Sequence, residues 1–296
     1  MPGTNPPLLD LPNPFLTEYG VLRLLEPADA DRAALLEQVL DGSYDKPFIL
    51  DDGAARTLYF SLAFIQSSMR IAAPDELDLV YTQKMMAFLL FQPAPRSMLL
   101  LGLGGGSLAK FCHRHFAQAE ITVVEYSPHV LAFREQFNIP PDDARFSIVL
   151  DDAARFVARP GPRYDVILLD VFDRHGLAGA VSTVDFFDQV RHRLPQRGVL
   201  VANLAGEKKH RAQHLDLMRQ SFGENILVLP VADEENHIVF AFRDAAFQPR
   251  WKWIASQAQT LRDRYNLDFP RFAAKLERSQ GSYRRVSSFL RSLRGA

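Results

Sequence analysis

The sequence predicts an α/β fold built on a mainly parallel β-sheet that an antiparallel hairpin closes at one edge. Short apolar runs alternate with helix-length amphipathic segments from residue 97 to residue 222, and such alternation is typical of parallel strands joined by crossover helices. Two later runs, Ile226–Pro230 and Asn236–Phe242, are separated by too few residues for a crossover, which predicts a hairpin. A loop with four glycines follows the first strand of the alternation and indicates a ligand site there.

The chain before the sheet predicts a small, mainly β segment and a linking helix. The proline-rich stretch Met1–Pro14 is expected to be a loose arm, and Asp31–Leu40 has the spacing of a short helix. Strand patterns occur three times, at Pro47–Leu50, Leu58–Phe60 and Ala63–Gln66. Leu77–Phe91 predicts one helix with broad apolar faces, in which Met85 and Met86 fill the core.

The sheet itself is predicted from five strands, at Ser97–Leu101, Ile121–Val124, Ser147–Leu150, Tyr164–Leu169 and Gly198–Leu204. Helices are expected at Leu108–Phe116, from Pro128, from Asp152, near Thr183–Leu194 and around Arg211–Phe222. A parallel sheet that ends in a late hairpin is typical of the Rossmann-like, methyltransferase-type fold. We therefore predict an N-terminal arm, β segment and linking helix (1–92), a nucleoside-cofactor-binding α/β domain (93–246) and a C-terminal helical extension (247–296).

The glycine-rich loop is the most informative motif of the chain. Leu99–Ser107 reads Leu-Leu-Leu-Gly-Leu-Gly-Gly-Gly-Ser, so an apolar strand runs directly into Gly102, Gly104, Gly105 and Gly106 and then a helix. Glycines let the backbone turn sharply and approach a ligand closely, and Ser107 is expected to cap the helix. About twenty residues after the first glycine, the next apolar run ends in Glu125, where nucleotide-binding sheets hold ribose hydroxyls.

The loop also indicates which nucleoside is bound. It lacks the Gly-Lys-Ser/Thr ending of a phosphate cradle, which argues against ATP or GTP hydrolysis. It fits the dinucleotide pattern only loosely, because Leu108 and Ala109 stand where the third glycine is expected. Gly-x-Gly-x-Gly followed by Val124-Glu125 is closer to enzymes that bind S-adenosylmethionine.

Composition and charge limit the partners, the location and the metal content that we expect for this protein. A net charge of −1 gives no field that would recruit nucleic acid or an anionic membrane, and we expect neither partner. Cys112 is the only cysteine, which argues against a disulfide framework and for a cytoplasmic protein. The first residues do not resemble a signal peptide, and no apolar run reaches the length of a membrane span. His210 and His214 lie one turn apart without the Glu of a zinc-protease motif, so we expect no metal.

Four motifs resemble the spermidine synthases, the polyamine aminopropyltransferases. They are Gly102–Gly106, Val124-Glu125, Leu150-Asp151-Asp152-Ala153 and the run from Tyr164 to Asp170 with Asp173 three residues later. The similarity runs from about Pro47 to Phe242. This resemblance implies a methyltransferase-type fold, a homodimer, and decarboxylated S-adenosylmethionine as the donor of an aminopropyl group to a polyamine.

The resemblance also implies roles for individual residues. Glu125 would hold the ribose hydroxyls and Asp152 the adenine amino group, while Asp170 would accept a proton from the attacking amine. Asp173 would orient the polyamine, and two further residues lie near the substrate entrance, Gln66 and Tyr81. The residue types suit this chemistry, because a polyamine is cationic at neutral pH and attacks only after one nitrogen loses its proton to a base.

Two departures from the family pattern keep other functions open. Gly105 stands where the family loop has an aspartate that grips the amino group of the donor, and Arg174 follows Asp173 where it would repel a polyamine and attract a carboxylate. The loop also resembles a methyltransferase-like branch that methylates protein amines with intact S-adenosylmethionine. The alternatives are therefore a methyltransferase acting on a protein or small-molecule amine, and a cofactor-binding protein that has lost catalysis.

Structural interpretations compete with these roles. Asp151 and Asp152 have the pattern of a pair that caps the helix following them, and Asp170 at a strand end can bond to the next loop instead of a substrate. His113 and His115 fit a solvated basic helix end. The basic amphipathic stretch Arg278–Ala296 is expected to dock on its own domain or on a dimer mate.

Overall fold

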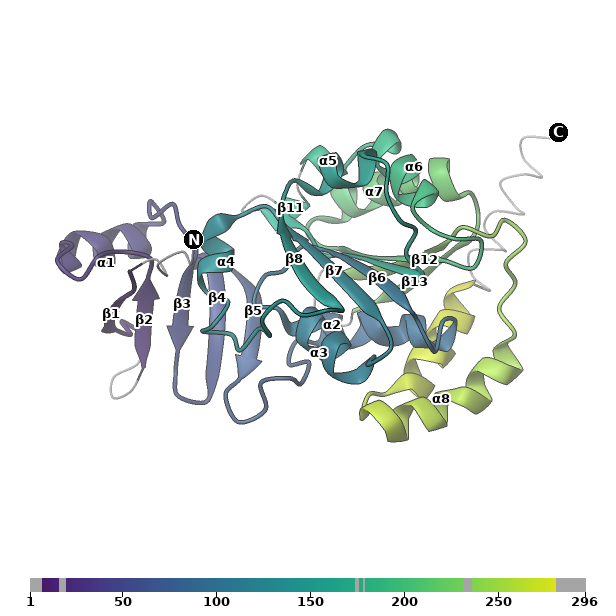
Figure 1. Ribbon diagram of the computed structural model, residues 1–296, viewed down its shortest axis with the longest axis horizontal. Coiled ribbons are helices and arrows are strands. Elements are labelled where there is room, and N and C mark those ends of the chain that lie inside the picture. The colour runs from purple at the N-terminus through teal and green to yellow at the C-terminus, as the bar shows by residue number, and fades with distance from the viewer. Residues whose placement is uncertain (1–6, 16–19, 174–175, 178, 232–235, 281–296) are drawn as a thin grey trace. The chain divides into compact units, whose positions relative to one another are not determined.

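The computed structural model describes residues 7–15, 20–173, 176–177, 179–231 and 236–280 (Figure 1). It divides into two compact units, each drawn from three stretches of the chain. The first comprises the described parts of Met1–Thr82, Leu100–Phe156 and Asp170–Ala178, and the second those of Gln83–Leu99, Val157–Leu169 and Gly179–Ala296. All the residues that the sequence predicts at the site belong to the first unit.

The first unit contains a five-stranded antiparallel sheet in the order β1-β2-β3-β4-β5. Its strands are β1 (Leu9–Pro12), β2 (Val21–Leu24), β3 (Phe48–Asp51), β4 (Ala55–Ser61) and β5 (Phe64–Arg70). The loose arm expected over residues 1–14 is therefore wrong for its last part, because β1 pairs with β2 in the register Leu9 to Leu24. Alternate leucines of both strands are buried in one apolar cluster. This burial stabilises β1, which is too short to be recognised as a strand from the sequence.

The helix of this sheet agrees with its sequence signals. α1 (Arg32–Asp41) begins after Asp31, whose side chain accepts hydrogen bonds from the backbone amides of Ala33 and Ala34 at 3.0 and 3.1 Å. It ends at Gly42 in the left-handed conformation, the usual helix stop. Val39 places the helix in the same apolar cluster as the leucines of β1 and β2.

The linking helix is divided where the sequence predicts one continuous element. α2 (Val80–Met85) is followed by the 3-10 helix η1 (Met86–Leu90), and the five residues of η1 are all buried. The amide of Phe91 donates to the carbonyl oxygen of Phe88 at 2.8 Å, an i to i+3 bond that tightens the last turn. Met85 and Met86 are completely buried, so their predicted role as core residues is confirmed.

A seven-stranded sheet has the order β13-β14-β12-β9-β6-β7-β8. Its strands are β6 (Ser97–Leu101), β7 (Glu120–Glu125), β8 (Phe146–Leu150), β9 (Val166–Leu169), β12 (Val199–Leu204), β13 (Ile226–Pro230) and β14 (His237–Phe242). β7 pairs with β8 and β9 with β12 in parallel, whereas β14 is antiparallel to both β12 and β13. The mainly parallel sheet closed by an antiparallel hairpin, the Rossmann-like methyltransferase-type fold, is confirmed.

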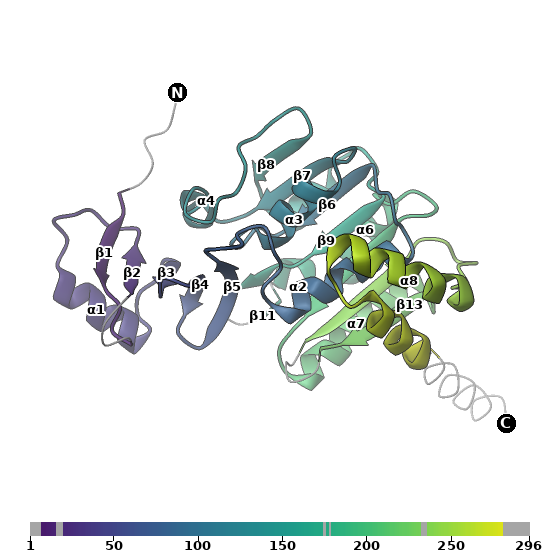
Figure 2. The same cartoon turned by 90° about the horizontal axis from the view of Figure 1, so that it is seen from below.

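The remaining elements are α3 (Ser107–His115), α4 (Pro128–Ala132), α5 (Ala153–Ala158), β10 (Phe172–Asp173), β11 (Gly176–Leu177), η2 (Gly179–Val181), α6 (Val184–His192), α7 (Lys208–Phe222) and α8 (Trp251–Tyr265). Within the second unit α6 packs against α7, and α8 packs against η1 (Figure 2). Residues 269–280 are helical as well, and most of the basic stretch Arg278–Ala296 lies outside the described residues. In the described part of the chain no helix has both the length and the apolar character needed to cross a bilayer.

Candidate active site

The glycine loop turns at the end of β6 and touches the ends of two other strands. Gly102 has a φ of +97°, and a Cβ built on it would lie 2.2 Å from the backbone oxygen of Asp170, so only glycine fits. The amide of Gly102 donates to the carbonyl oxygen of Val124 at 2.8 Å. The amide of Asp170 donates to the carbonyl oxygen of Leu101 at 2.9 Å. The loop therefore lies directly beside the residues that follow β9 and end β7.

The far half of the loop is packed tightly and has no room for side chains. A Cβ at Gly105 would lie 2.6 Å from Ser67 Oγ, which β5 brings against the loop. α3 begins at Ser107 with Gly106 as its N-cap, and no side chain caps it. The predicted cap by Ser107 is therefore wrong: the serine lies one position inside the helix, and its hydroxyl donates instead to the carbonyl oxygen of Ser68 at 3.4 Å.

Glu125, at the end of β7, is fixed to the glycine loop. Its Oε2 accepts from the amide of Leu103 at 2.9 Å and its Oε1 from the amide of Ser127 at 2.7 Å. Burial raises the pKa of the carboxyl group above its ordinary value, and these backbone hydrogen bonds oppose the rise. A carboxylate has about four acceptor positions, and the amides of Tyr126 and Gly104 also bond Glu125, so backbone amides already engage most of its acceptor capacity.

The two aspartates after β8 both act in local structure. Asp152 Oδ1 accepts from the amide of Arg155 at 2.8 Å and so caps the first turn of α5. Asp151 is buried, its amide donates to the carbonyl oxygen of Glu125 at 2.9 Å, and its Oδ1 accepts from Arg155 Nε at 2.6 Å. Of the predicted capping pair, Asp152 caps the helix, whereas Asp151 bonds the Arg155 side chain and, through its amide, the end of β7.

Asp170 and Tyr81 are brought together from positions 89 residues apart. Asp170 directly follows the buried strand β9, and its Oδ2 accepts a hydrogen bond from the Tyr81 hydroxyl at 3.2 Å. Gln66 is half-buried on β5, next to the Ser67 that touches the loop. Asp173 lies in β10, but its side chain is outside what the structure describes, as are the neighbouring Arg174 and His175.

Two exposed apolar side chains beside Glu125 were not expected from the sequence. Tyr126 is 72% exposed and Leu150 is 53% exposed, and Leu150 is paired with Glu125 in the register of β7 and β8. Large apolar side chains in such exposure are candidates for ligand contact. The signal was present in the sequence, because both residues flank acidic residues at strand ends.

Two of the histidines that the sequence singled out make local contacts. His113 Nε2 lies 3.0 Å from Asp143 Oδ2, and its ring makes an edge contact with Phe146. His214 Nε2 lies 2.9 Å from Ser182 Oγ. Among the residues that the structure describes, no group of three or more His, Cys, Asp or Glu side chains is arranged to hold a metal ion.

Comparison with known proteins identifies the family of the chain. The model of the spermine/spermidine synthase domain matches residues 78–226. The polyamine aminopropyltransferase of Chromobacterium violaceum is 33% identical over 233 residues, which cover 78% of this chain and 89% of that protein.

Solved structures share the fold. A probable spermidine synthase from Corynebacterium glutamicum superposes with a TM-score of 0.62 at 20% identity, covering 79% of this chain and 93% of that one. Human methyltransferase-like protein 13 in complex with SAH superposes with a TM-score of 0.58 at 24% identity, covering 64% and 93%. From the matched domain and the sequence relatives together, the chain is a transferase that belongs to the spermine/spermidine synthase family.

Proposed function

We propose that the chain transfers an aminopropyl group from decarboxylated S-adenosylmethionine to an amine of a polyamine. The observation that carries the proposal is the Tyr81–Asp170 pair, whose aspartate directly follows β9 and touches the glycine loop through its backbone. A base held by a strand end, next to a nucleoside-type loop, suits a reaction between a nucleoside donor and an amine. The homologue that is 33% identical is named as an enzyme of this activity.

The donor site is built from residues on three strand ends. Glu125 accepts the two ribose hydroxyls, which share its oxygens with the backbone amides that bond them or displace some of those amides. Asp152 accepts from the adenine amino group through the carboxylate oxygen that does not cap α5. Tyr126 and Leu150, both exposed beside Glu125, bury the flat faces of the adenine.

In this reaction the attacking amine loses one proton and gains one carbon substituent. The nitrogen lone pair forms a bond to the methylene carbon attached to the sulfonium, the carbon–sulfur bond breaks, and its electron pair neutralises the sulfur. Asp170 takes the amine proton, and Tyr81 orients the carboxylate through its hydrogen bond. Asp173 and Gln66 hold the rest of the polyamine. Because the sulfonium is already a good leaving group, alignment of nitrogen, carbon and sulfur supplies most of the catalysis.

The decisive experiment pairs two donors with several acceptors. Purified protein is incubated with decarboxylated or intact S-adenosylmethionine and with putrescine, spermidine or an acidic amine, and products are identified by mass. The proposal expects an added aminopropyl group with the decarboxylated donor and a polyamine. Methylation with the intact donor, or no turnover of any polyamine with either donor, would reject it.

A methyltransferase that uses intact S-adenosylmethionine on a protein or small-molecule amine is the second candidate. One observation favours it: Gly105 presents no side-chain carboxylate that would repel the carboxylate of the intact donor, and Ser67 and Phe137 fill the space that a side chain there would need. A donor-binding protein without catalysis is the third candidate. Binding of donor without turnover of any amine would identify it.

Three further expectations extend the proposal. The family resemblance supports a homodimer, which light scattering of the purified protein tests by its mass. It also supports a cytoplasmic location and a reaction that needs no metal ion. If the reaction needs no metal ion, turnover should be undiminished after treatment of the protein with a chelator.

A further inference from the structure

The glycine loop rests against a turn that follows α4, which we call the backing turn and define as residues 133–139. Phe137 and Ile139 of the backing turn are buried. A Cβ at Gly105 would lie 3.0 Å from Phe137 Cδ1, and one at Gly106 would lie 2.5 Å from Ile139 Cγ1. The space beside both glycines is too small for a Cβ atom, so Phe137 and Ile139 pack directly against the backbone of the glycine loop, and we expect a displacement of the backing turn to displace the loop.

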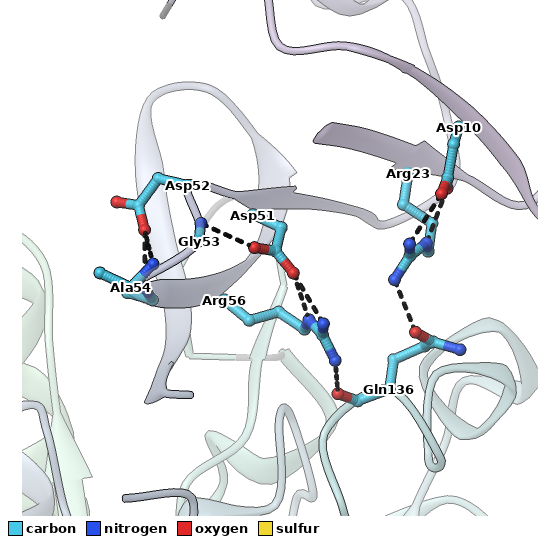
Figure 3. Close-up of polar contacts among 9 residues, drawn as sticks. Asp10, Arg23, Asp51, Asp52, Gly53, Ala54, Arg56 and Gln136 are labelled. Carbon is cyan, nitrogen blue, oxygen red and sulfur yellow. Dashed lines mark hydrogen bonds and ion pairs between the residues drawn. The ribbon is translucent and has the colours of Figure 1, made fainter. Parts of the chain in front are cut away.

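Two arginines of the N-terminal sheet hold the middle of the backing turn (Figure 3). Arg56 on β4 donates to the backbone oxygen of Gln136, and its Nε and Nη2 donate to Asp51 Oδ2 at 2.8 and 2.7 Å. Arg23 on β2 donates to Gln136 Oε1 at 2.6 Å and pairs with both oxygens of Asp10 at 2.7 Å. The carboxylates fix the two guanidinium groups, so each arginine presents its remaining donor to the turn in a set direction.

A lysine holds the same turn from the helix that follows the glycine loop. Lys110 on α3 is only 2% exposed, and its ammonium donates to the backbone oxygen of Phe137 at 2.7 Å and lies 3.0 Å from Met69 Sδ. Burial lowers the pKa of Lys110 to about 8. An apolar side chain would fill this space without the cost of burying a charge. What the lysine adds is a bond that fixes the backbone of Phe137.

From these contacts we propose that Arg56 and Lys110 are positioning residues for the nucleoside site: they fix the backing turn, and the turn sets the conformation of the glycine loop. This inference rests on the proposed function, in which the glycine loop binds the nucleoside of the donor. Both side chains act through the backbone oxygens of the turn, Arg56 through that of Gln136 and Lys110 through that of Phe137. The N-terminal sheet is then a part of the donor site and not an appendage to it.

The test compares variants by nucleoside affinity and by steady-state kinetics. For Arg56→Gln we expect the dissociation constant of 5′-methylthioadenosine, measured by calorimetry, to rise about 3- to 30-fold, the range for mutations that act on a site through packed neighbours. The KM for the donor rises with it, while the KM for the acceptor is unchanged. Lys110→Met shows the same pattern, and Arg56→Lys, which keeps a donor for Gln136, recovers part of the affinity.

Lys46→Gln is the matched control, because Lys46 is a half-buried cation just before β3 that bonds the carbonyl oxygen of Leu25 and the carboxylate of Glu26, neither of which belongs to the backing turn. We expect its affinity and KM values to equal those of the wild type. Hydrogen exchange gives a second measurement: amides of residues 103–107 exchange faster in Arg56→Gln than in the control. If Arg56→Gln does not fold, Arg23→Gln replaces it under the same criteria.

The outcomes separate this inference from the proposed function. A wild-type protein that does not bind 5′-methylthioadenosine refutes the proposed function itself. A wild type that binds it, together with an Arg56→Gln variant of unchanged affinity and unchanged exchange at residues 103–107, overturns the positioning role alone. Equal losses in Arg56→Gln and Lys46→Gln also overturn it, because they indicate general destabilisation of the sheet.

Discussion

At the scale of single residues, several side chains hold the loop and are also proposed to meet the substrate. Glu125 bonds the glycine loop through Leu103 and is proposed to bond ribose. The sequence identified Glu125, Asp152 and Asp170 because acidic residues at strand ends form a recognisable pattern. It could not show that Ser107 lies inside its helix, because the N-cap is decided by the positive φ of Gly106 and not by residue preference.

The proposed role of Glu125 predicts that donor binding depends on pH. Burial raises its pKa, so in the free protein its contribution to stability is greatest below its ordinary pKa and is lost as the pH rises through the raised value. The ribose hydroxyls bond the ionised form, so nucleoside affinity should fall as the pH falls through that value. Calorimetric titrations across the acidic range check this, with Glu125→Gln expected to remove the dependence.

Removal of the Glu125 side chain gives the size of the ribose contact. Glu125→Ala should weaken nucleoside binding by about 1.5–3 kcal/mol, the loss expected for hydrogen bonds to a charged acceptor. Calorimetry measures it, and the melting temperature shows whether the loop amide of Leu103 was destabilised as well. An unchanged affinity with native-like melting would remove Glu125 from the site.

Asp170 and Asp173 should differ in their kinetic effects. Asp170→Asn should lower kcat by about 10²–10⁴, the range for loss of a general base, with nucleoside affinity nearly intact. Asp173→Asn should mainly raise the KM for the polyamine. Steady-state kinetics with putrescine and spermidine measure both. An unchanged or lower KM in Asp173→Asn would indicate an anionic acceptor and would contradict the polyamine assignment.

At the scale of elements, the strand and helix order of the main sheet could be predicted because its periodicity is strong and its strands are buried. The first two strands could not, since Leu9–Pro12 and Val21–Leu24 are each four residues long and are ordered by their mutual pairing. The division of the linking helix into α2 and η1 was also hidden. The broad apolar faces of the linking helix predict that it is buried, but they do not predict where an α-helix changes to a 3-10 helix.

The strand-end turn at Gly102 should be far less tolerant of a side chain than a surface turn. In Gly102→Ala the new Cβ sits on a backbone of positive φ and clashes with the backbone oxygen of Asp170. In Gly53→Ala the backbone also has a positive φ, +83°, but no atom lies within 4 Å of the new Cβ. Gly53→Ala should cost about 1–2 kcal/mol for the left-handed backbone alone. Gly102→Ala should cost at least about 2 kcal/mol more. Urea unfolding of the two variants measures the difference, and equal costs would contradict the close approach.

At the scale of the whole molecule, the sequence predicted three contiguous segments, 1–92, 93–246 and 247–296, whereas each of the two compact units is drawn from three separate stretches. Local patterns indicate elements, whereas the two compact units depend on contacts between distant stretches. The proposed site draws on all three stretches of the first unit, so no contiguous segment contains it. Tyr81, Glu125 and Asp170 show this directly, one from each stretch.

Buried titratable groups predict how the stability of the whole chain responds to alkali. The lowered pKa of Lys110, about 8, makes stability rise with pH above that value, because the unfolded chain then binds more protons. Burial raises the pKa of Cys112 and of Tyr44, so both lose protons more readily when unfolded, and stability falls above about pH 9. Unfolding free energies measured from pH 7 to 11 should pass through a maximum. Lys110→Met should abolish the rising part.

The contact between Gly102 and Asp170 has a consequence for the order of biosynthesis. During translation the glycine loop leaves the ribosome well before Asp170, at a few residues per second or more, and until then the tight turn lacks the backbone against which it closes. Closing a loop of this length slows folding. We therefore expect an interval in which β6 has emerged but the glycine loop has no fixed shape, so that the proposed nucleoside recognition begins only after β9 is in place.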